Sequence, residues 1–176
     1  SKLKPFLEAE YETYSSAADL YVYFIEKGID VLSESGLFAY ITSNKFMRAD
    51  YGREIRSYLR EQTQINEIVD FGELPVFDDA STFPAILLMR KSDPGEKSTK
   101  ITKIKSLEFS DLTNVVEENH YYTTDDGLDS DGWSLARREK LQLQSKMEET
   151  GTQLDSYLPG EINWGVKTGL NEAFVI

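Results

Sequence analysis

Apolar positions recur with a helical period near the start of the chain. Within residues 17–34, apolar side chains return at steps of three and four, which predicts one amphipathic helix. The stripe consists of Leu20, Phe24, Ile25, Ile29 and Leu32. Ser15 or Ser16 is a candidate cap for its start, and Gly36 is expected to end it.

The pattern up to residue 91 then predicts alternating strands and helices. In order these are a strand over Leu37–Ile41, a helix over Ala49–Gln62, a strand over Ile65–Phe71, a loop over Gly72–Ser81 and a strand over Phe83–Arg90. The first strand is apolar on both faces, as buried parallel strands are. Pro84 is expected to hold the start of the last strand near a sheet edge, because proline cannot donate to a ladder.

This alternation predicts an α/β fold. The helix over residues 17–34 precedes the first strand, and its own partner strand is not in the chain. Three strands cannot easily bury two layers of helices. We therefore interpret residues 1–91 as a fragment, the C-terminal half of a Rossmann-like, doubly wound sheet.

Beyond residue 91 the pattern is less regular. A polar, turn-rich stretch at Lys91–Ser98 predicts a linker or an exposed hairpin. The later elements are expected to be an exposed strand over Ile101–Leu107, an acidic and mostly irregular segment over Asp111–Asp131, a helix over Leu135–Glu149 that Gly151 stops, and short apolar pieces over Ile162–Ile176. The expected division is 1–91 for the partial sheet, 92–134 for a linker and acidic, β-containing segment, and 135–176 for the start of a further domain. Beyond residue 91 we expect a partial, mostly irregular α+β segment.

The composition excludes several classes of protein. The 176 residues contain no cysteine and one histidine, His120, so disulfide scaffolds, thiolate sites and multi-histidine metal centres are ruled out and no metal site is predicted. No apolar run approaches the roughly 20 residues of a membrane helix, and the N-terminus lacks the apolar core of a signal peptide. We therefore expect a soluble, cytoplasmic protein. With 40% apolar and 12% aromatic residues it has enough material for a packed core.

The net charge of −12 argues against generic binding of nucleic acid, yet the charge is uneven. Between Ser106 and Trp133 there are eight acids and no Lys or Arg. Between Lys45 and Arg60, five bases stand against two acids. These bases are Lys45, Arg48, Arg53, Arg56 and Arg60. They predict either a locally basic face on an acidic molecule or, as for most charge runs, a solvated amphipathic helix.

Isolated motifs carry little chemistry. The glycines are scattered, so neither the dinucleotide fingerprint nor the P-loop is present. Asp78 and Asp79 are adjacent, and adjacent loop carboxylates usually point apart into solvent rather than forming a catalytic pair. His120 lies beside two tyrosines in the acidic segment, where a structural or surface role is favoured over catalysis.

Several short segments, taken in order and spacing, are more informative. They are Asp19–Glu26, Gly36–Phe46, Tyr51–Arg56, Ile68–Phe71 and Pro75–Thr82. Together they resemble the adenine-N6 DNA methyltransferases of bacterial restriction–modification and phage-defence systems, in particular the type IIG and BREX-type enzymes of TaqI-like architecture. A second stretch, from near Leu141 to Trp164–Phe174, resembles the start of the TaqI-like target-recognition domain.

The resemblance implies roles for particular residues. Such enzymes bind S-adenosylmethionine at the carboxyl ends of the parallel strands and turn the target adenine out of the duplex. Phe24, with Tyr21 as second choice, would face the cofactor's adenine, although both also fit as core residues of a helix. Phe77 would stack on the flipped base, with Phe83 as the structural alternative that starts a strand. The DNA contacts would come from Lys45, Arg48 and Arg53, and from Lys167, Thr168 and Asn171 in the recognition segment.

The family's glycine-containing cofactor loop and its Asn/Asp-Pro-Pro-Tyr tetrapeptide precede the matching region. The chain has five prolines and no two are adjacent, so the catalytic tetrapeptide is absent from it. We expect the 176 residues alone to be inactive, and S-adenosylmethionine, double-stranded DNA and restriction or phage-defence subunits to bind the full-length protein only. The alternative is a non-catalytic acidic α/β interaction module, which an upstream Asn-Pro-Pro-Tyr would exclude. A third interpretation, a domain that binds a nucleoside or another small molecule, is weaker because the chain contains no phosphate-binding loop.

Overall fold

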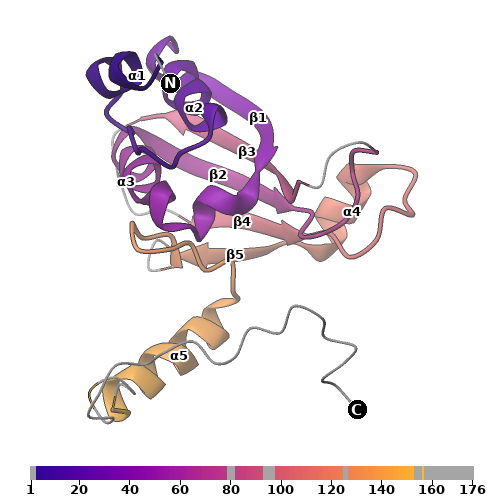
Figure 1. Ribbon diagram of the computed structural model, residues 1–176. Helices are drawn as coiled ribbons and strands as arrows, with labels where there is room; N and C mark the ends of the chain where they lie inside the picture. The colour runs from indigo at the N-terminus through magenta and orange to yellow at the C-terminus, as the bar shows by residue number, and fades with distance from the viewer. Residues whose placement is uncertain (1–2, 79–81, 93–97, 125–126, 153–155, 157–176) are drawn as a thin grey trace, which may run out of the picture. The chain divides into compact units, whose positions relative to one another are not determined.

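The computed structural model describes residues 3–78, 82–92, 98–124, 127–152 and 156. The chain divides into two compact units, Ser1–Leu141 and Gln142–Ile176. The elements in order are α1 (Lys4–Glu10), α2 (Leu20–Asp30), β1 (Leu37–Ser43), the 3₁₀ turns η1 (Asn44–Met47) and η2 (Asp50–Gly52), α3 (Arg53–Gln62), β2 (Thr63–Asp70), β3 (Pro84–Lys91), β4 (Ser98–Lys103), α4 (Leu112–Asn119), β5 (Tyr121–Thr124) and α5 (Arg138–Thr150) (Figure 1). No helix in the described ranges is long and apolar enough to cross a membrane.

Within the described residues, the strands form one five-stranded sheet in the order β1-β3-β2-β4-β5. Strand β3 is antiparallel to both of its neighbours, β1 and β2. Strand β4 runs parallel to β2, and β5 returns antiparallel to β4. The carboxyl ends of β1, β2 and β4 therefore meet at the same edge of the sheet.

Each face of the sheet has its own apolar cluster. Helices α2 and α3 cover one face, where Ile25, Ile55 and Leu59 pack with Ile68 and Leu87. Helix α4 covers the other face, where Val116 packs with Val69, Phe71 and Ile104. Neighbouring residues such as Ile68 and Val69 point to opposite faces because side chains alternate along a strand. The α/β fold class predicted from the sequence is confirmed.

Two expectations about the strands are wrong. Strand β1 lies at the edge of the described sheet, pairs antiparallel with β3, and has no fully buried residue. Its Leu37 is 53% exposed and its Ile41 is 44% exposed. Conversely, β3 lies inside the sheet rather than near an edge. It tolerates Pro84 because proline is its first residue, where no interior ladder bond is lost.

Helix α2 is shorter than predicted and buries a different stripe. It runs from Leu20 to Asp30 with Asp19 as its N-cap, so neither Ser15 nor Ser16 caps it. The left-handed residue after it is Ser35, with φ of 61°, rather than Gly36. The buried positions are Val22, Tyr23, Ile25, Glu26 and Ile29, whereas Leu20 and Phe24 of the predicted stripe are exposed.

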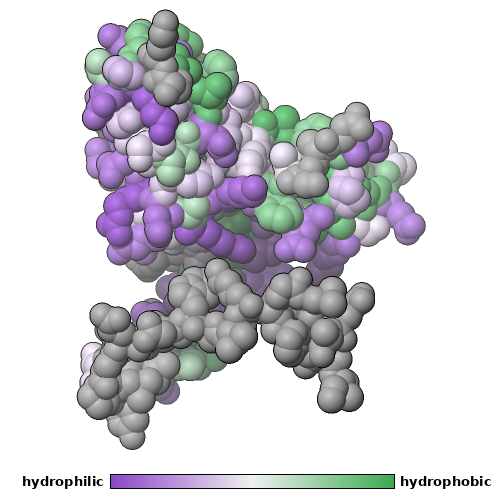
Figure 2. Space-filling model, in the orientation of Figure 1, coloured by the Kyte–Doolittle hydropathy of each residue, from purple (hydrophilic) through white to green (hydrophobic). Residues whose placement is uncertain are grey.

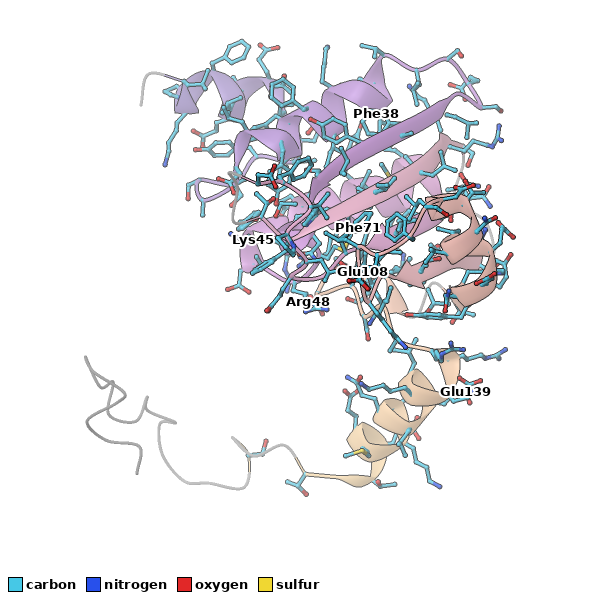
Figure 3. The ribbon with its side chains drawn as sticks, turned by 90° about the vertical axis from the view of Figure 1, so that its right-hand side faces the viewer. Phe38, Lys45, Arg48, Phe71, Glu108 and Glu139 are labelled. Atoms are coloured by element: carbon cyan, nitrogen blue, oxygen red, sulfur yellow. The ribbon has the colours of Figure 1, made fainter. Side chains whose placement is uncertain are left out.

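Two close contacts fix α2 in place. A Cβ added to Gly28 would lie 2.3 Å from the ring of Phe38 in β1, so glycine permits this close packing (Figure 3). The buried Glu26 carboxylate accepts hydrogen bonds from the backbone N–H groups of Glu12 and Thr13, each at 3.0 Å. The buried Glu26 side chain thereby holds the segment that follows α1 against α2. The apolar pattern did not predict helix α1.

The acidic segment is more ordered than predicted. It contains α4, capped by Asp111, whose Oδ1 accepts from the Thr113 N–H at 2.8 Å, and β5, which pairs with β4. Strands β4 and β5, which follow residue 91, therefore belong to the same sheet as β1, β2 and β3. Strand β4 starts three residues before Ile101 and ends at Lys103. Leu135 is buried in the core ahead of α5, and α5 itself ends directly before Gly151, as predicted. The segment Ile162–Ile176 lies outside the described residues.

Candidate functional site

The edge where β1, β2 and β4 end is held together by polar contacts. Asn44, which follows β1, donates its side-chain N–H to Asp70 Oδ1 at the end of β2, at 2.8 Å. The same oxygen accepts the Gly72 N–H at 3.0 Å, and Gly72 takes φ of 57°, a conformation that favours glycine. The Asn44 N–H donates to the carbonyl of Phe83, just before β3, at 2.7 Å. These bonds join the residues that follow β1 and β2 to the residue that precedes β3.

Of the basic residues predicted for this edge, Lys45 lies in η1 and Arg48 directly follows it (Figure 3), while Arg53 directly follows η2. We refer to η1, Arg48 and η2 as the basic turns. Lys45 lies over the ring of Phe83, with its Nζ 5.8 Å from the ring centroid. Arg48 is exposed, and no ion pair of the described residues involves it. Arg53 opens α3 and forms an exposed ion pair with Asp131 at 2.6 Å. Lys45 and Arg48 are thus the freer of the three charges.

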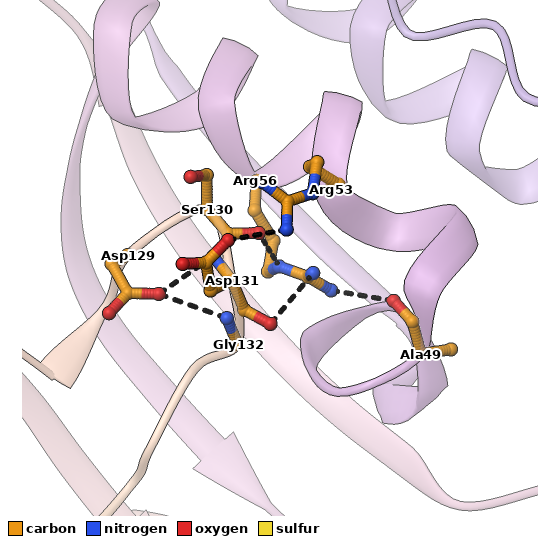
Figure 4. A network of polar contacts seen from close by, with 7 residues as sticks. All are labelled: Ala49, Arg53, Arg56, Asp129, Ser130, Asp131 and Gly132. Atoms are coloured by element: carbon orange, nitrogen blue, oxygen red, sulfur yellow. Dashed lines mark hydrogen bonds and ion pairs between the residues drawn. The ribbon is translucent and has the colours of Figure 1, made fainter. Parts of the chain in front are cut away.

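Arg56 belongs to the interior rather than to the basic face (Figure 4). Its buried guanidinium donates to the carbonyls of Ser130 at 2.9 Å, Ala49 at 2.9 Å and Asp131 at 3.3 Å, and also to the carbonyl of Phe46. Burial lowers the pKa of Arg56, and the neighbouring Arg53 adds to this effect. This guanidinium joins η1 and η2 to residues 130–131 of the acidic segment.

The same junction has no room for larger side chains. A Cβ on Gly52 would lie 2.0 Å from the carbonyl oxygen of Phe46. The backbone N–H of Trp133 donates to the carbonyl of Met47 at 2.7 Å, and the centroids of the Trp133 and Phe46 rings, which meet edge-on, lie 5.4 Å apart. The end of the acidic segment, at Trp133, therefore packs against η1. The sequence gives little sign of this role, because its acids only indicate solvation.

The two candidate cofactor residues differ in their surroundings. The Tyr21 hydroxyl shares a 2.8 Å hydrogen bond with Tyr51, and its ring meets Phe46 edge-on. Burial and the bond to Tyr51 raise its pKa. Phe24 is 63% exposed and shows no ring contact with another described residue. Tyr21 is therefore engaged in contacts within the chain, whereas the ring of Phe24 is available for a contact.

Phe77 projects from an anchored loop. The loop between β2 and β3 is held by Leu74 and Val76, which pack into the α4-side cluster, and by a 3.0 Å bond from the Leu74 N–H to the Phe71 carbonyl. Phe77 itself is 45% exposed, as expected for an unpartnered ring. Phe83 is half-buried beneath Lys45 and directly precedes β3. The structure thus places Phe77 at the same sheet edge as Lys45.

Of the other candidate residues, His120 has described contacts. His120 contacts the carbonyls of Val116 and Glu117 through Nδ1, which agrees with a structural role. Lys167, Thr168 and Asn171 lie outside the described residues, as does Asp79, while Asp78 is exposed. In the described ranges no group of three or more His, Asp or Glu side chains is placed to hold a metal ion. Sequence reasoning missed Asn44 and Asp70, although each stands where an apolar strand ends.

The amino-acid sequence is similar to those of known restriction–modification methyltransferases. Residues 1–77 match the Eco57I restriction-modification methylase family. The chain is 26% identical over 169 residues to the type II restriction enzyme and methyltransferase RM.Eco57I of Escherichia coli, covering 94% of this chain and 16% of that protein. It is 25% identical over 183 residues to the type II methyltransferase M.PaeR7I of Pseudomonas aeruginosa, covering 95% and 31%. The chain therefore spans less than a third of the length of either relative.

Solved structures share the fold. A modification subunit assigned to a type I restriction enzyme of Vibrio vulnificus superimposes with a TM-score of 0.58 at 14% identity, over 77% of this chain and 36% of that chain. A protein assigned as a class I S-adenosylmethionine-dependent methyltransferase of Listeria monocytogenes gives 0.51 at 15% identity, over 65% and 36%. The type IIG restriction endonuclease BpuSI gives 0.52 at 12% identity, over 79% and 17%. The chain is thus homologous to type II methyltransferases and has the fold of class I methyltransferases.

Proposed function

We propose that the full-length protein containing this chain transfers a methyl group from S-adenosylmethionine to adenine N6 in double-stranded DNA. The observation that carries the proposal is the exposed ring of Phe77 on an anchored loop, at the same edge as the free charges of Lys45 and Arg48. A ring that can stack on a base beside phosphate-binding charges is what a base-flipping enzyme needs. The related type II methyltransferases support the reaction class.

In this proposal the chain supplies only part of the catalytic domain. The edge of β1 is unpaired among the described strands, and its Leu37 and Ile41 are exposed. Large apolar side chains are also exposed in and beside α1 and α2, namely Leu3, Phe6, Leu20 and Phe24. Figure 2 shows hydrophobic surface at its upper end, where these helices lie. An open apolar edge of this kind is a ready template for a further strand. The remaining length of the protein would supply that strand and the catalytic tetrapeptide.

The cofactor would supply the methyl group when bound, and Phe24 would form one wall of its site. Tyr21 is less suited to that role because its hydroxyl and one ring edge are already in contact with Tyr51 and Phe46. On the same proposal, residues 135–176 begin a TaqI-like recognition domain in which Lys167, Thr168 and Asn171 contact DNA. We place the enzyme in a type IIG or related phage-defence system of the bacterial cytoplasm, where restriction subunits are the expected partners.

The test is methyl transfer by the full-length protein. The protein is incubated with plasmid or bacteriophage duplex DNA and methyl-labelled S-adenosylmethionine, and label in the DNA is counted. Stable incorporation that saturates at a fixed number of sites per DNA molecule is expected of a site-specific enzyme. Absence of label in every DNA offered, with a protein that binds the cofactor, would instead favour the non-catalytic interaction module.

The basic turns predict a graded salt dependence. In the full-length protein, Lys45→Gln and Arg48→Gln should each reduce the slope of log affinity against log salt by about one unit, because each removes a phosphate contact. Arg53→Gln should change it less, since Asp131 already pairs with that guanidinium at 2.6 Å. The measurement is fluorescence anisotropy of labelled duplex DNA over a salt series. An Arg53 variant with a larger change than the Arg48 variant would contradict this ranking.

The isolated chain should not bind the cofactor. It contains no glycine-rich loop, and its one well-exposed candidate, Phe24, offers a single wall. Titration calorimetry of the 176 residues with S-adenosylmethionine should therefore show no binding in the micromolar range, whereas the full-length protein should bind. Circular dichroism of the isolated chain serves as the folding control. Micromolar affinity of the folded isolated chain would refute this prediction.

A further inference from the structure

A basic pocket lies at the carboxyl end of β4, on an otherwise acidic chain. Its volume is about 410 Å³, and four positively charged side chains line it together with a single acidic one, Glu118. The basic residues are Lys103, Lys105, Arg137 and Lys140. A chain of net charge −12 therefore concentrates like charges around one hollow.

The fold fixes the walls of this pocket. Lys103 is the last residue of β4, and Tyr121 is the first residue of the neighbouring strand β5. The Tyr121 hydroxyl donates to the carbonyl of Leu135 at 2.7 Å, which ties the segment before α5 to the sheet. The Arg137 guanidinium lies over the Tyr121 ring, 4.6 Å from the centroid, so a cation–π contact orients it.

The positive charges of the pocket outnumber the acidic groups beside them in the described part of the chain. No ion pair of the described residues involves Lys103, Lys105, Arg137 or Lys140. Partial burial lowers the pKa of Lys103, and the positive charges of Arg48 and Lys140 add to this effect, while Asp70 opposes it. Four crowded cations beside a single lining carboxylate form a surface that favours an anion.

The pocket lies next to the sheet edge that we propose to bind DNA, and this position indicates which anion it binds. Lys103 pairs with Asp70 at the end of β2, and Asp70 Oδ1 accepts from the side chain of Asn44, which directly precedes Lys45. The pocket is therefore continuous in charge with the edge assigned to DNA, while none of its four bases was assigned to DNA from the sequence. We propose that this pocket binds a phosphodiester group of the DNA backbone, outside the methylated base. The proposal rests on the proposed function.

The test compares variants of the full-length protein. The double variant Lys103→Gln/Lys140→Gln should weaken duplex DNA binding about tenfold near 0.1 M salt and reduce the salt slope by about one unit. The loss should be equal for DNA with and without the methylation site, because phosphates carry no sequence information. Arg60→Gln, which removes an exposed charge from α3, is the matched control and should change neither quantity. Melting temperatures confirm that both variants are folded.

A second measurement locates the bound DNA directly. Amine-reactive labelling followed by mass spectrometry should show Lys103 and Lys140 protected by duplex DNA, and the exposed Lys27 of α2 unprotected. Methyl transfer with unprotected lysines and an unchanged slope would overturn the pocket and leave the proposed function standing. Protection of both lysines without methyl transfer would support the pocket and refute the proposed function. Neither protection nor transfer would refute both.

Discussion

Replacing Arg56 with leucine should lower the free energy of unfolding by about 1–3 kcal/mol for each buried carbonyl that is left without a donor. The substitution leaves the carbonyls of Phe46, Ala49, Ser130 and Asp131 without their shared donor. Leucine cannot replace these bonds, and the carbonyls stay partly buried. The basic turns should then lose their attachment to the acidic segment.

The measurement is the urea midpoint of the full-length protein. Arg60→Leu, at an exposed position of the same helix, controls for the loss of charge and should shift the midpoint little. Arg56→Lys should recover only a small part of the loss. The lysine ammonium lacks the planar, five-donor fork with which the arginine guanidinium reaches four carbonyls. An Arg56→Leu midpoint equal to that of the Arg60 control would show that this network does not hold the junction.

Replacing Phe77 with alanine should reduce kcat/KM for DNA methylation by about 5- to 150-fold, because stacking on an aromatic ring is worth about 1–3 kcal/mol per base. The fold should be unaffected, since the ring is 45% exposed and its loop is anchored by Leu74 and Val76. Phe77→Trp should keep much of the activity because any flat ring can stack on a base.

Steady-state methylation of a duplex that contains the recognised site measures this effect. Tyr122→Ala removes another exposed ring, 56% exposed, from β5 and is the matched control, for which wild-type kinetics are expected. Unchanged melting temperatures would separate a local effect from unfolding. Wild-type kinetics for Phe77→Ala would show that Phe77 does not stack on the flipped base, and would leave the description of the fold unchanged.

The local pattern predicted much of the first half of the fold. Strands β1, β2 and β3 and helix α3 were expected within a few residues of where they lie, because each forms a short apolar or amphipathic run bounded by turn residues. The exposure of Phe77 was also expected, since a lone aromatic residue in a polar loop has no packing partner nearby in sequence.

The remaining features depend on contacts between distant residues. The insertion of β3 between β1 and β2 cannot be read from either strand, and it is what moves β1 to the edge. The burial of Arg56 depends on carbonyls 74 and 75 residues away, so its sequence neighbours only suggest a basic face. Helix α4 has few apolar positions of its own and is stabilised by packing on the sheet.

Analysis of the methylated base most directly tests the central claim that this chain belongs to an adenine-N6 DNA methyltransferase. Duplex DNA is treated with the full-length protein and S-adenosylmethionine, digested to nucleosides and examined by mass spectrometry against untreated DNA. The account predicts N6-methyldeoxyadenosine as the new nucleoside, with its yield reduced in the Phe77→Ala enzyme. A methylated cytosine as the sole new nucleoside, or equal yields from the two enzymes, would contradict it.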